Sequence, residues 1–392
     1  MRGRRLGAGI ALLASSFLVG LAPHAEADVE GLTETNAARY VVAADGSAVK
    51  VSVTMSLRNT LPDQRSGNQV RYFYFTSYQV PVPAGASNLR ATSGGSTLTV
   101  TTEDGPEASI RIASIAFPQL RHALTREITL TYDLPGAELR SKDPTRVGKG
   151  FAAFPALAWG EPGRTTLDIV APEGYDFHST SDIFTETAAD SSVTRRASEH
   201  TDETGIWAFV TLRDPAQTAE RSITVGGDEV SLLSFPGDEA WADFVDQKLA
   251  EGVPALEELL GTPWPGGLDT VREDVSPTVT GYAWFDFTQR EILLGEEFDT
   301  QLLLHETSHA WLNDDHLSGR WLQEGLAEVV SRRLAPRIGG EETPSDVPER
   351  DSGPAFPLSH WRTPTGLAVG ETDEYGYAAA HAAVDALIGG LE

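Results

Sequence analysis

One short pattern limits the folds open to this chain more than any other: an HExxH sequence that runs from His305 to His309. Residues four apart lie on the same face of an α-helix, one turn apart, so both histidines can point at one ion. Apolar residues flank the pattern at Leu302 to Leu304 and at Ala310 and Trp311, and they would bury such a helix. The pattern therefore predicts a buried helix that carries two metal ligands.

A carboxylate downstream completes a three-ligand set. Glu324 follows His309 after the fourteen residues 310–323 and opens a predicted helix from Glu324 to Arg333. Catalytic zinc sites use three protein ligands, mostly imidazoles, carboxylates or thiolates, and keep a fourth position open for water. The chain contains no cysteine, so thiolates are excluded. We therefore expect one Zn2+ per chain, bound by His305, His309 and Glu324.

Two further carboxylates have predicted roles beside this ion. Glu306 adjoins the first ligand, so its carboxylate can take a proton from a zinc-bound water, whose pKa falls from about 15.7 toward about 7. Glu328 lies one helical turn beyond Glu324 and is predicted to hold a ligating imidazole in place. The alternative interpretation of Glu328 is a solvated charge on the helix face. Glu306 is the expected general base.

The same region argues against the metzincin class of zinc proteases. That class has Gly at the position of Leu312 and His at the position of Asp315, whereas the nearest histidine here is His316. We expect Asp314, Asp315 and His316 to form a polar loop between the two helices instead.

The segment Trp321 to Ala327 carries a family resemblance. Its pattern, Trp-Leu-x-Glu-Gly-x-Ala after HExxH, resembles the aminopeptidase N-like family of gluzincin zinc metallopeptidases, in which this Glu is the third zinc ligand. Members usually have about eighteen residues between the second His and the Glu, roughly one 3.6-residue helical turn more than this chain, so the ligand stays in phase. The resemblance implies the same ligand role for Glu324.

A segment upstream occupies the place of the family's substrate-binding edge strand. It begins Gly281, Tyr282 and Ala283, and the resemblance implies that these residues bind an extended peptide by strand addition. In the aminopeptidases the strand begins Gly-Ala-Met-Glu-Asn, and its Glu binds the free amino terminus of the substrate. Trp284 or Phe285 stands at that place here, so exopeptidase and endopeptidase activity both remain open.

A tyrosine downstream resembles the family residue that hydrogen-bonds the tetrahedral intermediate. Tyr375 and Tyr377 precede a predicted alanine-rich helix from Ala378 to Leu387, and the apolar positions of that helix favour Tyr377. The alternative is an aromatic side chain packed into the core at the start of a helix.

These residues together predict a zinc-dependent metallopeptidase that is aminopeptidase-like and acts on a peptide or protein substrate. Three alternatives remain: an endopeptidase of the same clan, a zinc hydrolase of non-peptide substrates, and a binding or adhesion module on a degenerate peptidase fold. The intact set of His305, Glu306, His309 and Glu324 argues against the last of these.

The amino-terminal 27 residues predict a cleaved signal peptide. Three arginines precede an apolar run from Ile10 to Leu21, and an A-x-A cleavage site ends at Ala27. No later stretch approaches the roughly 20 apolar residues that span a bilayer, so we expect a secreted protein without a membrane-spanning segment. The net charge of −27 argues against nucleic-acid partners, which need clustered Lys and Arg. The oligomeric state stays open.

The hydrophobic pattern divides the rest of the chain near residue 230. Residues 28–230 alternate as half-buried strands do, for example from Val49 to Arg58, and 71–75 is predicted to be a buried aromatic strand. Residues 231–392 change to helical spacing from Trp241 to Leu260, with a kink or break at Pro254, followed by strands near 268–271, 279–287 and 292–294.

This order implies a multidomain α+β architecture like that of the family. An N-terminal all-β sandwich or saddle domain would precede a thermolysin-like α/β zinc peptidase domain. Members of the family usually continue with further helices, so this chain is either a compact member or a fragment.

Overall fold

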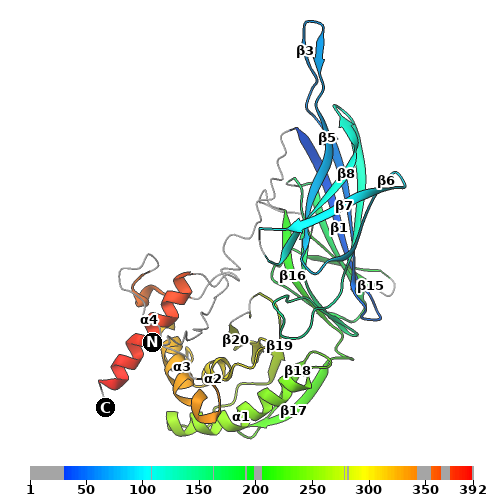
Figure 1. Cartoon of the computed structure of the whole chain (residues 1–392). Helices are drawn as coiled ribbons and strands as arrows, with labels where there is room; N and C mark the ends of the chain where they lie inside the picture. The colour runs from blue at the N-terminus through cyan, green and yellow to red at the C-terminus, as the bar shows by residue number, and fades with distance from the viewer. Residues whose placement is uncertain are drawn as a thin grey trace, which may run out of the picture.

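The computed structural model describes most of the chain, with the amino-terminal segment and several short stretches left out. The described residues are 31–106, 108–161, 163–189, 192–197, 205–277, 279, 282–341, 355–362 and 371–390. The predicted signal peptide (1–27), its cleavage site and Gly281 lie outside them. A β-rich part stands beside a smaller part that carries the four α-helices of the described chain (Figure 1). None of these helices is long and apolar enough to cross a membrane.

Two sheets and a short hairpin make up the first part. The larger sheet has ten strands in the order β14 (Thr185–Ala189), β15 (Ser192–Ala197), β12 (Thr165–Pro172), β1 (Leu32–Val42), β2 (Val49–Asn59), β9 (Thr125–Leu134), β6 (Ser87–Ser93), β7 (Ser96–Asp104), β8 (Ile110–Arg121) and β5 (Tyr74–Pro83). The smaller sheet has four strands in the order β10 (Arg146–Gly148), β11 (Phe151–Ala158), β16 (Ile206–Arg213) and β13 (Asp176–Ser179). The hairpin pairs β3 (Gln64–Ser66) with β4 (Gln69–Arg71).

Alternating side chains build the core between these sheets. In β2 every second residue is buried, as the sequence predicts for a half-buried strand. Tyr40 of β1 stacks on Phe154 of β11 at 5.7 Å between ring centroids, so the two sheets meet face to face. The Tyr40 hydroxyl lies 3.1 Å from the Tyr132 hydroxyl and donates to the Leu157 carbonyl, which satisfies a polar group in the core.

The prediction of a buried aromatic strand over residues 71–75 is wrong. Strand β4 ends at Arg71 and β5 begins at Tyr74, while Tyr72 and Tyr74 are 55% and 47% exposed. Strand β5 is the last of its sheet, and the β3–β4 hairpin projects beyond the sheet (Figure 1). Aromatic residues at this edge favour extended structure, but no second layer of the described chain covers Tyr72 and Tyr74, so they stay exposed. The guanidinium of Arg121 lies 5.6 Å over the Tyr72 ring instead.

A mixed sheet and four helices form the second part. The sheet has the order β17 (Ala219–Val225), β18 (Asp228–Ser234), β19 (Thr270–Glu273), β21 (Glu291–Leu294) and β20 (Ala283–Asp286). Strands β18, β19 and β21 are parallel, and β20 pairs antiparallel at the edge. The helices are α1 (Glu239–Leu260), α2 (Thr300–Ser308), α3 (Arg320–Leu334) and α4 (Glu371–Gly389), with 3₁₀ turns η1 (Ala335–Ile338) and η2 (Leu358–His360). The predicted domain boundary after residue 230 falls within β18, and it remains a prediction.

Helix α1 begins and ends where the sequence predicts. The Asp238 side chain caps it by accepting a hydrogen bond from the Trp241 amide at 3.2 Å, and left-handed Gly261 ends it. The predicted break at Pro254 does not occur. The helix runs through this residue from Glu239 to Leu260. Proline inside a helix costs about 3 kcal/mol. Burial of neighbours such as Val253 and Leu256, each worth roughly 1.5–3 kcal/mol, offsets that cost.

Buried charges join the two parts of the molecule. Arg146 of β10 forms an ion pair with Glu296, and both side chains are almost fully buried. Arg140 donates to both carboxylate oxygens of Asp238, at 2.8 and 2.7 Å. The Arg213 guanidinium donates to a backbone carbonyl of β19 and lies 4.3 Å over the Phe235 ring. Two arginine–carboxylate pairs therefore cross this contact, and losing one partner of the buried Arg146–Glu296 pair is strongly destabilising.

Glu273 lies at this contact with an unusual protonation behaviour. Its side chain is fully buried and accepts a hydrogen bond from the Phe235 amide at 2.7 Å. Burial, with a smaller contribution from the neighbouring Asp238 carboxylate, raises the pKa of Glu273 from 4.5 to about 9. Between these two values the folded protein binds a proton that the unfolded chain releases. Its contribution to stability is therefore present below pH 4.5 and is lost as the pH rises through this window.

We predict that Glu273→Gln stabilises the protein at neutral and alkaline pH, because glutamine imitates the protonated acid and cannot ionise. The advantage in free energy of unfolding should grow from pH 5 to pH 9, by at most about 1.4 kcal/mol per pH unit, and the thermal midpoint should rise with it. Thermal unfolding of both proteins across that range measures it. Glu229→Gln, at an exposed position on β18, is the matched control. A constant difference between Glu273→Gln and the parent would contradict the assignment.

Candidate metal centre

Helix α2 carries the first four residues of the HExxH sequence, His305 to Ser308. Asp299 caps it by accepting a hydrogen bond from the Leu302 amide at 2.9 Å. The helix ends at Ser308, whose hydroxyl donates to the His305 carbonyl at 2.7 Å. His309 follows as the C-cap residue and keeps helical backbone angles, so it still lies on the same side as His305.

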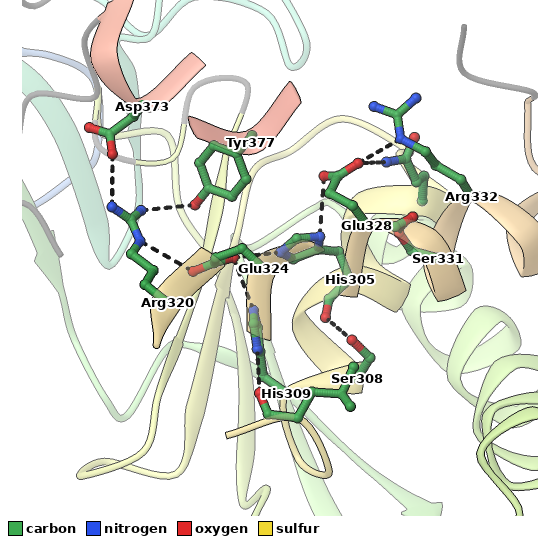
Figure 2. A network of polar contacts seen from close by, with 12 residues as sticks. His305, Ser308, His309, Arg320, Glu324, Glu328, Ser331, Arg332, Asp373 and Tyr377 are labelled. Atoms are coloured by element: carbon green, nitrogen blue, oxygen red, sulfur yellow. Dashed lines mark hydrogen bonds and ion pairs between the residues drawn. The ribbon is translucent and has the colours of Figure 1, made fainter. Parts of the chain in front are cut away.

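Helix α3 brings the third residue of the candidate ligand set. It begins at Arg320, one turn earlier than predicted, after Gly319 at a positive φ of 96°. Glu324 therefore lies in the second turn, where it faces α2 (Figure 2). Gly325 allows close packing behind it, because an added Cβ would lie 2.7 Å from the Ala380 carbonyl of α4. The glycine of the Glu-Gly pair thus permits α3 and α4 to approach each other.

The three side chains converge on one point. Glu324 Oε2 lies 3.1 Å from His305 Nε2 and 3.5 Å from His309 Nε2. One ligand atom from each residue lies within 4.8 Å of the other two, and His305 and His309 are buried. Zinc–ligand bonds of 2.0–2.1 Å in a tetrahedron place ligand atoms about 3.3 Å apart. The donor set and its spacing fit a zinc ion, and this is a possible His-His-Glu metal site.

Charge balance at the cluster supports that fit. Burial disfavours the charged imidazole of His305, but the carboxylates of Glu324 and Glu328 more than offset it and hold its pKa well above the usual range. Burial likewise opposes ionisation of Glu324, yet hydrogen bonds from both imidazoles hold its pKa well below the usual range. The site therefore retains positive charge between carboxylates. A divalent cation would supply that charge in place of the protons, since metal binding displaces them.

The outer nitrogens of both imidazoles have their own partners. His309 Nδ1 lies 3.0 Å from the Leu312 carbonyl and must donate to it, which leaves Nε2 for the cluster. His305 Nδ1 lies 3.3 Å from Glu328 Oε1, an ion-pair contact without the geometry of a hydrogen bond. The other oxygen of Glu328 accepts from Arg332 Nε at 2.6 Å (Figure 2). Burial raises the pKa of Glu328, but His305 and Arg332 bring it down to about 2. With its side chain 13% exposed, Glu328 is not a solvated surface charge.

Glu306 lies on the same helix and points toward the edge of the sheet. It is 6% exposed. Burial raises its pKa above the usual value, while the two imidazoles and a hydrogen bond to the Phe285 backbone partly offset this rise. A carboxylate with a raised pKa accepts a proton near neutral pH more readily than a surface glutamate.

The segment around Tyr377 differs from the prediction. Helix α4 begins at Glu371, so Tyr375 and Tyr377 lie within it and do not precede it. A glycine next to an aromatic residue resembles a helix boundary in sequence, but Gly376 fits here because an added Cβ would collide with the Trp361 indole. The Tyr377 ring lies 6.1 Å from the His305 ring, whereas Tyr375 packs on Phe356 at 5.3 Å. The structure thus brings Tyr377, and not Tyr375, to the cluster.

The predicted substrate-binding segment lies beside the cluster where it is described. Tyr282 lies 6.4 Å from the Tyr377 ring, and burial raises its pKa to about 12. Ala283 begins β20, the edge strand of the five-stranded sheet. Gly281 lies outside the described residues. The loop before α3 contains Asp314, Asp315 and His316, as predicted, and His316 is exposed and contacts Asn313.

Arg320, Trp361 and Asp373 belong to the site and were missed by the sequence interpretation. Arg320 contacts Glu324, Asp373 and the Tyr377 hydroxyl (Figure 2). Trp361 Nε1 donates to Asp373 Oδ1 at 2.9 Å. The spacing of four residues between Arg320 and Glu324 was the one available signal, since such pairs face each other on a helix.

Comparison with known proteins gives weak matches. No protein-family model and no curated protein matches the chain. Similar solved structures include an M1 zinc metallopeptidase from Deinococcus radiodurans, with 16% identity, 80% of this chain and 73% of that chain covered, and a TM-score of 0.30. A variant of a two-domain M1 zinc metallopeptidase bound to L-tryptophan has 15% identity, the same coverage and the same TM-score.

We predict that Glu328→Gln weakens zinc binding by about 10- to 100-fold, the usual loss when the partner of a metal-ligating imidazole is removed. The amide keeps the shape but loses the charge that faces His305 Nδ1. A chelator-competition titration measures the affinity. Asp385→Asn is a suitable control, because its carboxylate pairs with Arg333 at the exposed end of the same helix pair. Equal zinc affinity in Glu328→Gln and the parent would exclude this role.

Proposed function

We propose that the protein is a secreted, zinc-dependent metallopeptidase that hydrolyses peptide bonds in an aminopeptidase-like manner, with one zinc per chain. The convergence of His305, His309 and Glu324 from two helices on one buried point carries the proposal. Glu306 and Tyr377 lie beside that point and supply the two further groups that amide hydrolysis needs. An endopeptidase with the same residues is the alternative.

A zinc ion held by the three ligands would polarise a substrate carbonyl and make a bound water acidic near neutral pH. Glu306 would act as the general base at its carboxylate, taking the proton from the attacking water. The same carboxyl group would then return that proton to the leaving amine. Its burial and raised pKa suit both steps, because the group must exist in both protonation states during turnover.

Tyr377 would donate a hydrogen bond from its hydroxyl to the oxygen that becomes negative when the carbonyl is attacked. Burial, together with the Glu324 carboxylate, raises the pKa of Tyr377 well above its ordinary value despite the nearby Arg320 guanidinium, so the phenol keeps its proton. A fixed donor aimed at this oxygen stabilises the transition state more than the substrate.

The substrate would lie along β20 as an additional strand. This strand is at the edge of its sheet, and the backbone of its Phe285 contacts Glu306. An extended peptide paired here would therefore bring its backbone carbonyls close to the general base. Trp284 or Phe285 stands where an aminopeptidase has an amine-binding Glu. Cleavage of an amino-terminally blocked peptide therefore decides between the aminopeptidase-like proposal and the endopeptidase alternative.

We predict that Glu306→Gln binds zinc like the parent but loses peptidase activity, because the amide cannot take the proton from water. Metal analysis and turnover of free and N-acetylated peptides test this directly. One zinc in both proteins with activity only in the parent supports the proposal, and cleavage of the acetylated peptide would identify an endopeptidase. Zinc without activity in the parent would argue for a binding module, and no zinc would refute the proposal.

We predict that Tyr377→Phe lowers turnover by about 100- to 1000-fold, the usual loss for one oxyanion donor, without loss of zinc. Steady-state kinetics at saturating zinc measure the effect. Tyr375→Phe is the matched control, because its ring packs on Phe356 away from the cluster. Parental turnover in Tyr377→Phe would remove this tyrosine from the mechanism.

A further inference from the structure

Arg320 occupies an electrostatically unfavourable place. It is the first residue of α3, where the partial positive charge of the helix terminus disfavours a cation, and its side chain is only 9% exposed. The first turn of α3 contains no acidic residue to compensate locally. The compensation comes from α4, where Asp373 Oδ1 lies 2.8 Å from Arg320 Nη1. A buried cation at such a place persists only where surrounding contacts hold it.

The guanidinium divides its donors among the groups of the site. Nε lies 3.5 Å from Glu324 Oε1, Nη2 lies 3.3 Å from the Tyr377 hydroxyl, and Nη1 donates to Asp373 and to the Arg362 carbonyl. Its planar face lies 4.2 Å over the Trp361 ring. These contacts reach the candidate zinc ligand and the candidate oxyanion donor from one side (Figure 2).

The polarity of these contacts fixes the direction of the Tyr377 proton. A guanidinium has donors and no acceptor, so the Tyr377 oxygen must accept from Arg320. The phenol proton then has to point away from Arg320. Trp361 packs edge-on against the Tyr377 ring at 5.0 Å and 86°, which restricts the ring itself. The hydroxyl proton is thereby left to point to the other side of its oxygen.

The same guanidinium separates the two oxygens of Glu324. Oε2 faces both imidazoles at 3.1 and 3.5 Å, whereas Oε1 faces Arg320. A partial rotation of the carboxylate plane would move its oxygens away from these partners, and the contacts with the cation and the imidazoles oppose it. Glu324 is therefore oriented by the groups on both of its sides.

We propose that Arg320 is a positioning residue that fixes the Glu324 carboxylate and the Tyr377 hydroxyl relative to each other, so that one binds zinc and the other meets the substrate oxyanion. The inference rests on the proposed peptidase activity for its kinetic part. Its metal-binding part is independent of any activity, because zinc affinity is measured without turnover.

The kinetic test compares R320M, Y377F and the double variant R320M/Y377F with the parent at saturating zinc. We expect R320M to lower kcat by roughly 100-fold, with KM nearly unchanged, because only the transition-state contact is lost. The double variant should be no more than a few-fold slower than Y377F, since residues that act as a unit are not additive. A loss equal to the product of both single losses, or parental kcat in R320M, would overturn the proposal.

The metal test measures zinc affinity by chelator competition. We expect R320M to bind zinc about 10-fold more weakly than the parent, within the range for residues that orient a ligand. Unchanged affinity would overturn the role of Arg320 toward Glu324. An inactive parent would refute the proposed function, and this titration would still decide the metal-binding part.

Two further variants separate positioning from loosened helix packing. R333M breaks the exposed 3.2 Å ion pair to Asp385 between the same two helices, and it should keep parental kcat and zinc affinity. A loss in R333M like that in R320M would assign the effect to helix docking and overturn the proposal. D373N keeps the arginine but weakens its anchor, so it tests the same point if R320M does not fold. D373N should lower kcat, and the double variant D373N/Y377F should be no more than a few-fold slower than Y377F.

Discussion

The arrangement of the site depends on one shared carboxylate, that of Glu324. One of its oxygens faces both imidazoles of the HExxH sequence, and the other faces Arg320, which in turn contacts α4. A single side chain therefore relates α2, α3 and α4 to one another. Without its negative charge, two imidazoles and a guanidinium would lie close together in a buried place, which is costly for like charges.

The β-rich part contributes to the site through the segment that leads into α2. Arg146 of β10 pairs with Glu296, and the Trp241 indole of α1 donates to the Gly295 carbonyl at 2.8 Å. Three residues after Glu296, Asp299 caps α2. The start of α2 is thus held from the four-stranded sheet and from α1 at once. The buried Arg146–Glu296 pair adds little stability by itself, but it fixes where α2 begins relative to the β-rich part.

The sequence predicted what depends on local spacing. The positions of His305, His309 and Glu324 follow from helix geometry, and the alternation in β2 follows from strand geometry. Contacts between distant residues were not predictable: Arg320 meets Asp373 across 53 positions, and only the folded chain brings them together. The predicted burial of Tyr72 and Tyr74 was wrong for a related reason. An aromatic strand pattern does not tell whether a second layer covers the strand. At Pro254, proline locally favours the end of a helix, but the burial of neighbouring side chains keeps α1 intact.

The connection between α2 and α3 determines which residue stands next to Glu324. After His309 the chain makes a compact turn, and Gly319, at a positive φ that other residues rarely adopt, leads directly into α3. The first helical residue is then Arg320, four residues before Glu324, so the residue that opens the helix faces that carboxylate at 3.5 Å. The chain therefore enters α3 at the cluster itself, and the side chain at the entry has to be compatible with a carboxylate beside it. An arginine meets that condition, because its guanidinium pairs with Glu324 on one side and with Asp373 of α4 on the other.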